Sequence, residues 1–352
     1  MSAAENPWGV PLLDVRPIAL GMLSTTKDAQ CARNAASFGR EDGTCFISIE
    51  PPVARRVAAG LRYRVEGTPA DGVLFNPDAM EQKWAIYLHR GQILFIRSWH
   101  RAVQAVADVR ITGGELEVTT VRGAFLDEDE APELTVRVLD FLIRSHAMEL
   151  IYPAPLIPGI EQDPREAALW CFSAFGDRAH FATPHALPLD PPEPPLRTHS
   201  LLHIAVAHGE VEPVRALLDA GTPPDVLARD GLAPLHWALV HGDDTRIARL
   251  LLERGSPVDV RSHEGATPLM NAAQGRNAAM TAFLLDRGAD PDAADGRGFT
   301  SLHRAAEMGE TEIVRLLLDH GASPAPEALG HTPRSLAASR GHAAIVELLD
   351  RR

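Results

Sequence analysis

Glycines recur at a nearly constant spacing in the C-terminal half of this chain, and this period constrains the fold more than any other feature. One set of four glycines has spacings of 34, 33 and 32 residues, and a second set has spacings of 34, 33 and 33. The first set is Gly231, Gly265, Gly298 and Gly330, and the second is Gly221, Gly255, Gly288 and Gly321. Two interleaved series with one period indicate a row of similar structural units.

One copy shows what each unit folds into. Thr300 is an N-cap residue that can accept backbone N–H groups, and Gly309 suits the left-handed residue that ends a helix. The apolar Ile313, Leu316 and Leu317 then follow at helical spacing. The unit is therefore a pair of short helices, too small to bury its own apolar stripe, and it becomes stable only by stacking on its neighbours.

These segments resemble ankyrin repeats. The family pattern of Thr-Pro-Leu-His, Ala-Ala-x-x-Gly, a Leu-rich stretch and Gly-Ala-Asp matches copies at Ala233–His236, Thr267–Met270 and Thr300–His303. The resemblance covers about residues 198–352 and implies an α-solenoid of about five repeats. Their expected boundaries are about 198–230, 231–264, 265–297, 298–329 and 330–352.

Three positions depart from the family pattern. Met270 and Ser335 replace the repeat's histidine, and Arg276 stands where the other copies have a glycine, so we expect a slightly distorted helix end in the third repeat. Three histidines keep the repeat position, where the resemblance implies hydrogen bonds between neighbouring loops rather than a metal site. They are His203, His236 and His303.

The resemblance also implies a protein partner, bound on a concave surface of loop tips and first helices. The variable positions that carry over to this chain are Arg229, Asp230, Leu232, Val240, His241, His263, Glu264, Gln274, Arg297, Phe299, Glu307, Met308, His331 and Arg340. Phe299 and Met308 are apolar where exposure is expected, which is typical of a binding hot spot, although single exposed apolar residues are common. Replacing both by aspartate should abolish partner capture without changing stability.

A proline-rich segment separates the repeats from the rest of the chain. Six prolines occur within residues 184–195, and such composition favours an extended spacer. We therefore expect a linker at 184–197 between a first domain at 1–183 and the repeat domain at 198–352. The residues of the first domain do not indicate a known family.

The sequence of the first domain alternates between apolar and polar residues, as is typical of β-strands. Short apolar runs separated by tight turns predict an antiparallel meander over residues 84–122, with earlier strands at 44–49 and 61–65. Helices are expected from Pro132, where Leu134, Val138 and Phe141 form a stripe, and from Pro164 to about Phe175. The fold class is therefore α+β, with helices on one face of the sheet. The acidic run at 127–130 lacks the spacing of a calcium loop and suits a solvated helix N-terminus.

Charge and composition exclude several classes of partner. The net charge is −13, which opposes nucleic-acid binding and docking to an anionic membrane, and no apolar stretch approaches the ~20 residues of a membrane span. The three cysteines are widely spaced and form no CxxC pair, which argues against a disulfide framework or a zinc site. The start of the chain also lacks the pattern of a secretory signal. We expect a cytoplasmic monomer without metal or cofactor.

Catalytic motifs are missing from the sequence. The phosphate-binding GxxxxGK loop, the GxSxG elbow and HExxH do not occur. Cys45 with His89, His100 or His146 would make a nucleophile pair only if a deep pocket brought two of them together. The sequence thus predicts a non-enzymatic scaffold or adaptor. Two alternatives remain, an enzyme or effector whose first domain acts on a recruited target, and an inhibitor or immunity protein.

Overall fold

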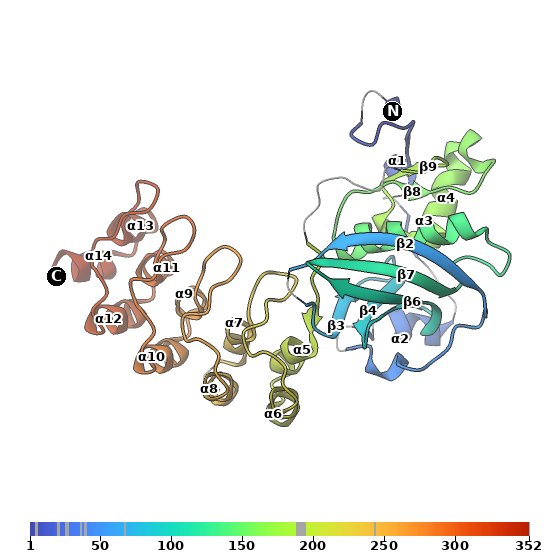
Figure 1. Ribbon diagram of the computed structural model, residues 1–352. Coiled ribbons are helices and arrows are strands. Elements are labelled where there is room, and N and C mark those ends of the chain that lie inside the picture. Colours follow the sequence, from blue (N-terminus) through green and yellow to red (C-terminus); the bar gives the residue numbers. More distant parts are fainter. Residues whose placement is uncertain are drawn as a thin grey trace. The chain divides into compact units, whose positions relative to one another are not determined.

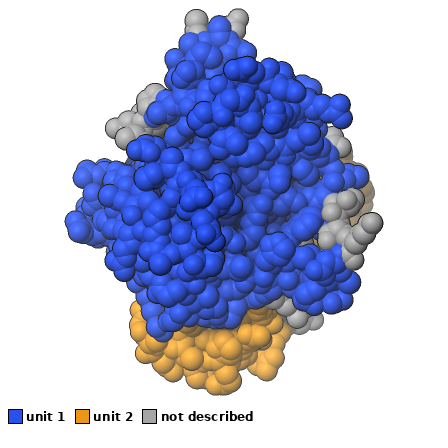
Figure 2. Space-filling model, turned by 90° about the vertical axis from the view of Figure 1, so that its right-hand side faces the viewer, with its two compact units in different colours: residues 1–199 blue, residues 200–352 orange. Residues whose placement is uncertain are grey.

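The computed structural model describes residues 1–3, 6–19, 22–24, 28–35, 37–38, 41–66, 68–187, 195–242 and 244–351 (Figure 1). The chain divides into two compact units, Met1–His199 and Ser200–Arg352, coloured separately in Figure 2. The centre of the expected linker, residues 188–194, lies outside the described residues. The segment that follows it belongs to the first unit, because Leu196 is buried there and its N–H donates to the carbonyl of Arg64 at 2.8 Å.

A large sheet forms the centre of the first unit. Its strand order is β10-β3-β4-β5-β6-β7-β2, and the pairings from β3 to β2 are all antiparallel. The strands are β2 (Arg56–Arg64), β3 (Gly72–Phe75), β4 (Trp84–His89), β5 (Gln92–Arg97), β6 (Ala102–Thr112), β7 (Glu115–Gly123) and β10 (His199–Ser200). The meander predicted over residues 84–122 is therefore confirmed.

The strand predicted over residues 44–49 is wrong. This segment contains a short 3₁₀ helix, η3 (Thr44–Phe46), which follows Gly43 in the left-handed conformation with φ +83°. The carboxylate of Asp42 accepts the backbone N–H of Thr44 at 2.9 Å, and the ring of Phe46 stacks on Tyr87 at 6.0 Å. An Asx-type turn and an inward ring thus override the β-propensity of the apolar residues. The strand predicted at 61–65 is present as the end of β2, which starts at Arg56 and ends at Arg64.

Helices cover one face of this sheet and pack on an apolar layer. The predicted helices at 132 and 164 are present as α3 (Pro132–Leu142) and α4 (Pro164–Phe175), and α3 continues into a π-helical turn, η4 (Ile143–Ala147). Side chains such as Ile86, Phe95 and Phe141 share one buried cluster. The opposite face carries α2 (Ala29–Ala35) (Figure 1), so the prediction of helices on one face alone holds for α3 and α4 but not for α2. With both faces covered, β4 is buried along its whole length, as its uninterrupted apolar sequence requires.

Shorter elements complete the first unit. A second sheet has the order β1-β9-β8, with β1 and β9 antiparallel and β8 and β9 parallel. Its strands and the remaining helices are β1 (Leu13–Asp14), β8 (Ala154–Pro155), β9 (Phe181–Thr183), α1 (Arg16–Ala19), η5 (Ile160–Gln162) and η6 (Gly176–Arg178).

The second unit consists of helices arranged in consecutive pairs (Figure 1). The pairs are α5 (Leu201–His208) with α6 (Val211–Asp219), α7 (Pro234–Trp237) with α8 (Arg246–Glu253), α9 (Pro268–Gln274) with α10 (Ala278–Asp286), α11 (Ser301–Met308) with α12 (Thr311–Asp319), and α13 (Pro333–Ser339) with α14 (Ala343–Asp350). A 3₁₀ turn, η7 (Ala238–His241), continues α7. The first helices of successive pairs contact one another from α5 to α13, and their leucines and alanines form one shared core.

The third pair ends its first helix without the expected distortion. In every pair the ninth residue after the N-cap is left-handed, and four of these five residues are glycines with φ between +61° and +83°. Arg276 occupies the position in the third pair and adopts the same conformation, with φ +59°. The helix end is preserved, and the arginine backbone carries the strain instead.

Candidate functional site

Histidines connect neighbouring loops of the second unit. His203, His236 and His303 each place Nε2 3.0–3.2 Å from a backbone carbonyl oxygen in the following pair, those of Leu232, Ala266 and His331. The three rings are buried. Among the residues that the structure describes, no group of three histidine, cysteine or acidic side chains could hold a metal ion. The structural role implied for these histidines is confirmed by the hydrogen bonds.

The predicted binding residues differ in exposure. Seven are exposed, namely Asp230, His263, Glu264, Gln274, Arg297, His331 and Arg340. Five are half-buried, namely Arg229, Leu232, Phe299, Glu307 and Met308. The side chains of Val240 and His241 lie outside the described parts of the structure.

Two adjoining pockets bring five of these predicted residues together. The larger, of about 940 Å³, is lined by Ala207, Leu232, His236, Trp237, Leu239, Gly242, Asn271, Gln274, Gly275, Arg276 and Asn277. The smaller, of about 350 Å³, is lined by Asp230, Leu232, Ser262, Glu264, Ala266, Met270, Asn271, Gln274, Asp295, Arg297 and Arg304. Leu232, Asn271 and Gln274 line both, so the pockets form one hollow across the first four helix pairs. None of Met308, His331 and Arg340 lines either pocket.

Charged groups fix one wall of the smaller pocket. Arg304 donates to Asp295 at 2.9 Å, and Asp295 also accepts the backbone N–H groups of Arg297 and Phe299, each at 2.9 Å. The guanidinium of Arg304 lies 4.9 Å from the centre of the Phe299 ring, and that ring packs against His303. Phe299 therefore supports the loop, and replacing it would change stability as well as binding. An aspartate at this position is a poor test of a binding surface.

Trp237 lines the larger pocket and was not among the predicted residues. Its Nε1 donates to Asp230 at 2.9 Å, and its ring meets His203 edge-on at a centroid distance of 5.3 Å. These contacts hold a half-buried aromatic ring beside Leu232 and Leu239. The sequence signal was present, because a tryptophan follows the repeat histidine where the other copies have Ile204, Asn271, Arg304 and Leu336.

Leu329 is an exposed apolar residue that was not among the predicted binding residues. It is 71% exposed, and it adopts a left-handed conformation with φ +51° just before Gly330. Its counterparts before the other repeat glycines are Asp230, Glu264 and Arg297. Leu329 is therefore the apolar residue that is exposed to solvent at this position of the repeats.

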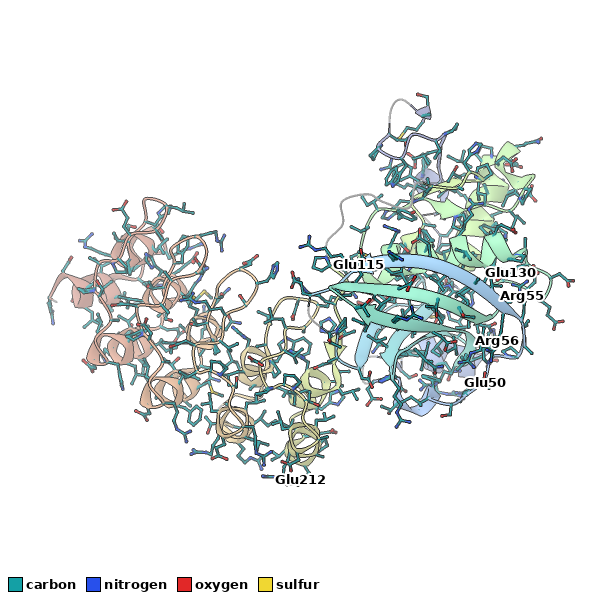
Figure 3. The ribbon with its side chains drawn as sticks, viewed as in Figure 1. Glu50, Arg55, Arg56, Glu115, Glu130 and Glu212 are labelled. Atoms are coloured by element: carbon teal, nitrogen blue, oxygen red, sulfur yellow. The ribbon has the colours of Figure 1, made fainter. Side chains whose placement is uncertain are left out.

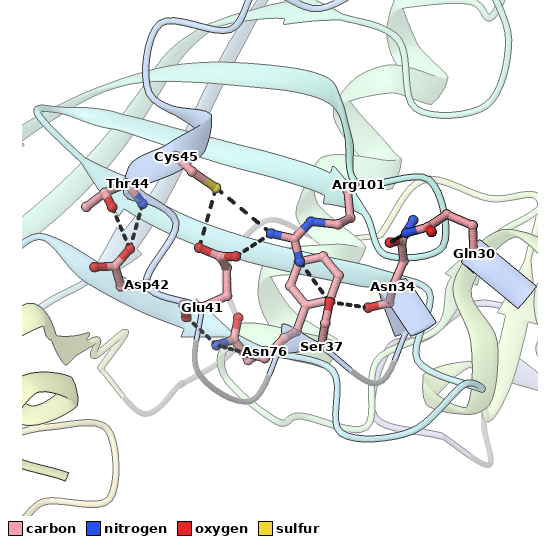
Figure 4. Close-up of polar contacts among 10 residues, drawn as sticks. Gln30, Asn34, Ser37, Glu41, Asp42, Thr44, Cys45, Asn76 and Arg101 are labelled. Atoms are coloured by element: carbon pink, nitrogen blue, oxygen red, sulfur yellow. Dashed lines mark hydrogen bonds and ion pairs between the residues drawn. The ribbon is translucent and has the colours of Figure 1, made fainter. Parts of the chain in front are cut away.

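The first unit does not bring Cys45 to a histidine among the described residues. Cys45 Sγ lies 3.4 Å from a carboxylate oxygen of Glu41 and 4.0 Å from the guanidinium of Arg101, which also pairs with Glu41 (Figure 4). Cys45 is exposed as a residue, but partial desolvation of its sulfur raises the pKa of the thiol first, and the charge of Glu41 raises it further, against the opposing effect of Arg101. The group is a thiol at neutral pH, which is unsuited to nucleophilic attack.

The three histidines proposed as partners of Cys45 have other surroundings. His89 Nε2 lies 2.8 Å from the carbonyl oxygen of Asp42, and His146 is fully buried between the rings of Phe75 and Phe141. His100 Nδ1 lies 3.9 Å from Sγ of a different cysteine, Cys31. Burial and a hydrogen bond to Asp28 raise the pKa of that thiol as well. A pocket of about 400 Å³ in the first unit is lined by His100 but by none of Cys45, His89 and His146.

Glu130 differs from the solvated acid that the sequence predicted. Its side chain is fully buried and accepts the backbone N–H groups of Phe125 at 3.0 Å and Leu126 at 2.9 Å. It also accepts a hydrogen bond from Thr135 at 2.7 Å and pairs with Arg55 at 3.2 Å (Figure 3). The other three acids of the run are exposed. Glu130 is a structural carboxylate that closes the turn before α3.

Comparison with known proteins identifies one part of the chain. The family model described as ankyrin repeats (three copies) matches residues 202–295, 242–328 and 283–351, and no family model matches the N-terminal part. The C-terminal part is therefore an ankyrin-repeat region, a module for protein–protein interaction. No curated protein matches the chain. Among the described residues, no helix has the length and apolar character needed to cross a membrane.

Proposed function

We propose that this protein is a non-enzymatic adaptor whose C-terminal region is an α-solenoid of five ankyrin repeats. The five consecutive helix pairs and their shared core support the repeat number. The protein partner binds across the first four repeats. The observation that carries this assignment is the continuous hollow formed by the two pockets, which contains Asp230, Leu232, Glu264, Gln274 and Arg297.

The two pockets differ in chemistry, and this difference describes the bound segment. The larger pocket presents Leu232, Trp237 and Leu239, so it receives an apolar anchor side chain. The smaller presents Glu264, Arg297 and the Asp295–Arg304 pair, so it receives polar and charged groups next to that anchor. A partner segment with one large apolar residue flanked by polar residues fits both.

The first unit, in this proposal, supplies a second binding surface or supports the first repeat, and carries no catalytic centre. The raised pKa values of the Cys31 and Cys45 thiols support this assignment. A cytoplasmic location and a monomeric state belong to the same proposal, and sedimentation of the purified chain tests the second of them.

A photo-crosslinking experiment tests the binding surface. The cross-linking amino acid p-benzoylphenylalanine is placed in the full chain at Gln274, an exposed pocket residue, or at Ala279, an exposed residue of α10 that lines neither pocket. In cells of the native host, we expect one cross-linked protein from position 274 and none from 279. Equal cross-linking from both positions would contradict the choice of surface.

A substitution at the same two positions measures the contribution of the hollow. Gln274→Arg places a bulky cation over the pockets and should weaken binding of the cross-linked partner at least tenfold, about 1.4 kcal/mol. Ala279→Arg introduces the same side chain in the same repeat and should leave the affinity unchanged. Both sites are exposed, so the unfolding transition should stay within about 0.5 kcal/mol of the parent.

A further inference from the structure

A separate pocket in the first unit contains two cations. Its volume is about 400 Å³, and it is lined by Leu23, Ser24, Lys83, Arg97, Trp99, His100, Leu169, Phe172 and Ser173. Lys83 immediately precedes β4, Arg97 is the last residue of β5, and α4 supplies the opposite wall. Adjacent antiparallel strands thus place both cations at one end of the sheet, where Trp84 pairs with Arg97.

Lys83 is one of only two lysines in the chain and is held in a buried position. Its Nζ donates to the carbonyl of Met80 at 3.1 Å and to the hydroxyl of Ser24. The ammonium lies 4.0 Å from the centre of the Trp99 ring, and that ring is fixed by its own hydrogen bond to Met80 at 3.0 Å. These contacts orient the ammonium but do not neutralise its charge.

Arg97 is held by uncharged groups as well. Its guanidinium donates to the carbonyls of Ser173 and Ala174, each at 2.6 Å, and lies over the ring of Trp84. Within the described parts of the chain, no carboxylate forms an ion pair with Arg97 or Lys83. A chain with net charge −13 therefore places two cations in one pocket, where the carboxylates of Glu81 and Asp177 act on Lys83 through their charge but form no ion pair with it among the described residues.

This arrangement disfavours the charged forms of both side chains. Burial lowers the pKa of Lys83 to about 8, and the nearby charge of Arg97 contributes to the decrease, against the opposing charges of Glu81 and Asp177. Burial also lowers the pKa of Arg97, to about 10. A bound anion would offset both effects, because it places an opposite charge in direct contact with the two cations in a partly desolvated site.

The rim of the pocket is apolar. Leu169 is 51% exposed and Leu23 is 80% exposed, and they are two of six large apolar side chains that are exposed among the described residues. With the rings of Trp99 and Phe172 they provide a surface for an apolar body next to the cations. Small-molecule sites combine apolar walls with a few oriented polar groups in this way.

We propose that this pocket binds a small organic anion, whose carboxylate or phosphate contacts Lys83 and Arg97 and whose apolar body lies against Phe172 and Leu169. This pocket does not share residues with the ankyrin surface, so a negative result for one of the two proposals leaves the other unaffected.

Nuclear magnetic resonance of the lysines tests the proposal on the full chain. Labelling lysine at ¹³Cε gives two signals, and Lys27→Arg assigns the one from Lys83. The probes are benzoate and phenyl phosphate, with benzamide as the uncharged match and acetate and inorganic phosphate as anions without the ring. We expect saturable shifts of the Lys83 signal by benzoate, phenyl phosphate or both, at Kd values of about 1–10 mM for ligands of this size, and none by benzamide. Whichever of the two saturates identifies the anionic group.

Other outcomes of this titration overturn the proposal. If none of the anions gives a saturable shift, the pocket is not an anion site. If acetate or inorganic phosphate binds as tightly as its ring-bearing counterpart, the apolar contact is refuted.

Two variants connect the binding to this pocket. Lys83→Met keeps a side chain of similar length without charge and should weaken benzoate or phenyl phosphate binding about tenfold or more, measured by calorimetry.

Leu169→Glu leaves Lys83 in place and sets a competing carboxylate at an exposed rim position. It should weaken binding to a similar extent and raise the pKa of Lys83. Ile151→Glu, at another exposed apolar residue of the same unit, is the control and should change neither value. Unchanged binding by Leu169→Glu would place the anion elsewhere, even if Lys83→Met failed to fold.

Discussion

The imidazole Nε2 of His303 lies 3.2 Å from the carbonyl oxygen of His331, which belongs to the next repeat. The opposite ring nitrogen, Nδ1, accepts the backbone N–H of Thr300 at 3.1 Å. Nδ1 therefore carries no proton, and Nε2 donates to the carbonyl. A protonated ring would direct an N–H group at the N–H of Thr300, so the hydrogen bond that Nδ1 accepts at the start of α11 requires neutral histidine, whereas Nε2 donates to His331 in either form.

The first prediction is a loss of stability in mild acid. Burial lowers the pKa values of His303 and His236 in the folded protein, so folding excludes a proton that the unfolded chain accepts near pH 6.5. The stabilisation by neutral histidine is complete above that pH and is lost as the pH falls below it, toward the folded-state pKa. Circular dichroism at 222 nm should show a lower midpoint of urea unfolding for the repeat helices at pH 5 than at pH 7.5.

The third repeat supplies the control substitution. Met270 occupies the histidine position there and is buried. His303→Met should cost about 1–3 kcal/mol at pH 7.5, because it leaves the His331 carbonyl without its donor, and it should reduce the difference between pH 7.5 and pH 5. An undiminished difference in this variant would assign the acid sensitivity to other groups.

Sequence alone predicted the repeats because their determinants are local. The N-cap, the left-handed glycine and the apolar spacing recur in each copy, so the structure inferred for one unit predicts the structure of the others. The pairing of β4 with β5 was equally accessible, since a tight turn joins two apolar runs. Packing partners distant in sequence were not accessible. Phe46 faces Tyr87, and only tertiary structure shows that this contact replaces a strand with a 3₁₀ helix.

The candidate binding surface was predicted in part for the same reason. Repeat alignment selects outward positions, and five of them line the hollow. Alignment gives no information on contacts between side chains of one loop. The alignment predicts that Phe299 is an exposed hot spot, whereas in the structure Arg304 and His303 lie against its ring. Trp237 was missed because its ring is positioned by Asp230 rather than by the repeat pattern.

The second prediction concerns the strained backbone of Arg276. A non-glycine residue in the left-handed region costs roughly 1–2 kcal/mol, whereas glycine loses about 0.5–1 kcal/mol of chain entropy and an exposed ion pair contributes less than about 1 kcal/mol. Arg276 forms one such pair, with Glu310 at 3.5 Å. Arg276→Gly should therefore stabilise the repeats by about 0.5 kcal/mol, measured by urea unfolding.

Gly309 is the matched position for this test. A side chain there would place its Cβ 2.6 Å from the ring of His342, so Gly309→Ala combines strain with a steric clash. We expect a destabilisation of about 2 kcal/mol or more. Arg276 also lines the larger pocket. Partner binding that weakens in the more stable Arg276→Gly variant would explain why an arginine is kept at a glycine position, whereas destabilisation by this change would refute the account of strain.

The third prediction concerns the buried carboxylate of Glu130. Glu130→Ala leaves the N–H groups of Phe125 and Leu126 without an acceptor and removes the partner of Arg55. We expect a loss of about 3–4 kcal/mol, followed by tryptophan fluorescence during urea unfolding. Four of the five tryptophans, Trp8, Trp84, Trp99 and Trp170, lie in the first unit and report on its unfolding.

Substitutions in the same acidic run distinguish the loss of these hydrogen bonds from an effect of charge alone. Glu128 is exposed, and Glu128→Ala should change the unfolding free energy by less than about 0.5 kcal/mol. Glu130→Gln keeps one acceptor oxygen and should lie between the two variants. Equal losses from Glu128→Ala and Glu130→Ala would show that the run acts through its total charge at the start of α3, as the sequence first indicated.

The last prediction separates a structural thiol from a catalytic one. Cys45 is the exposed cysteine, whereas Cys31 and Cys171 are buried, so a thiol reagent such as dithionitrobenzoate should react with Cys45 first in the native protein. The pKa of this thiol is raised by burial and by Glu41, and only Arg101 opposes them. Glu41→Gln removes one raising effect, and it should accelerate the reaction at pH 7.5 by about three- to tenfold, because the rate follows the thiolate fraction. Glu50→Gln, at an exposed carboxylate that pairs with Arg122, should leave the rate unchanged. If the parent chain instead reacts at pH 6 as fast as at pH 8, the thiol is already ionised and the enzymatic alternative for the first unit regains its nucleophile.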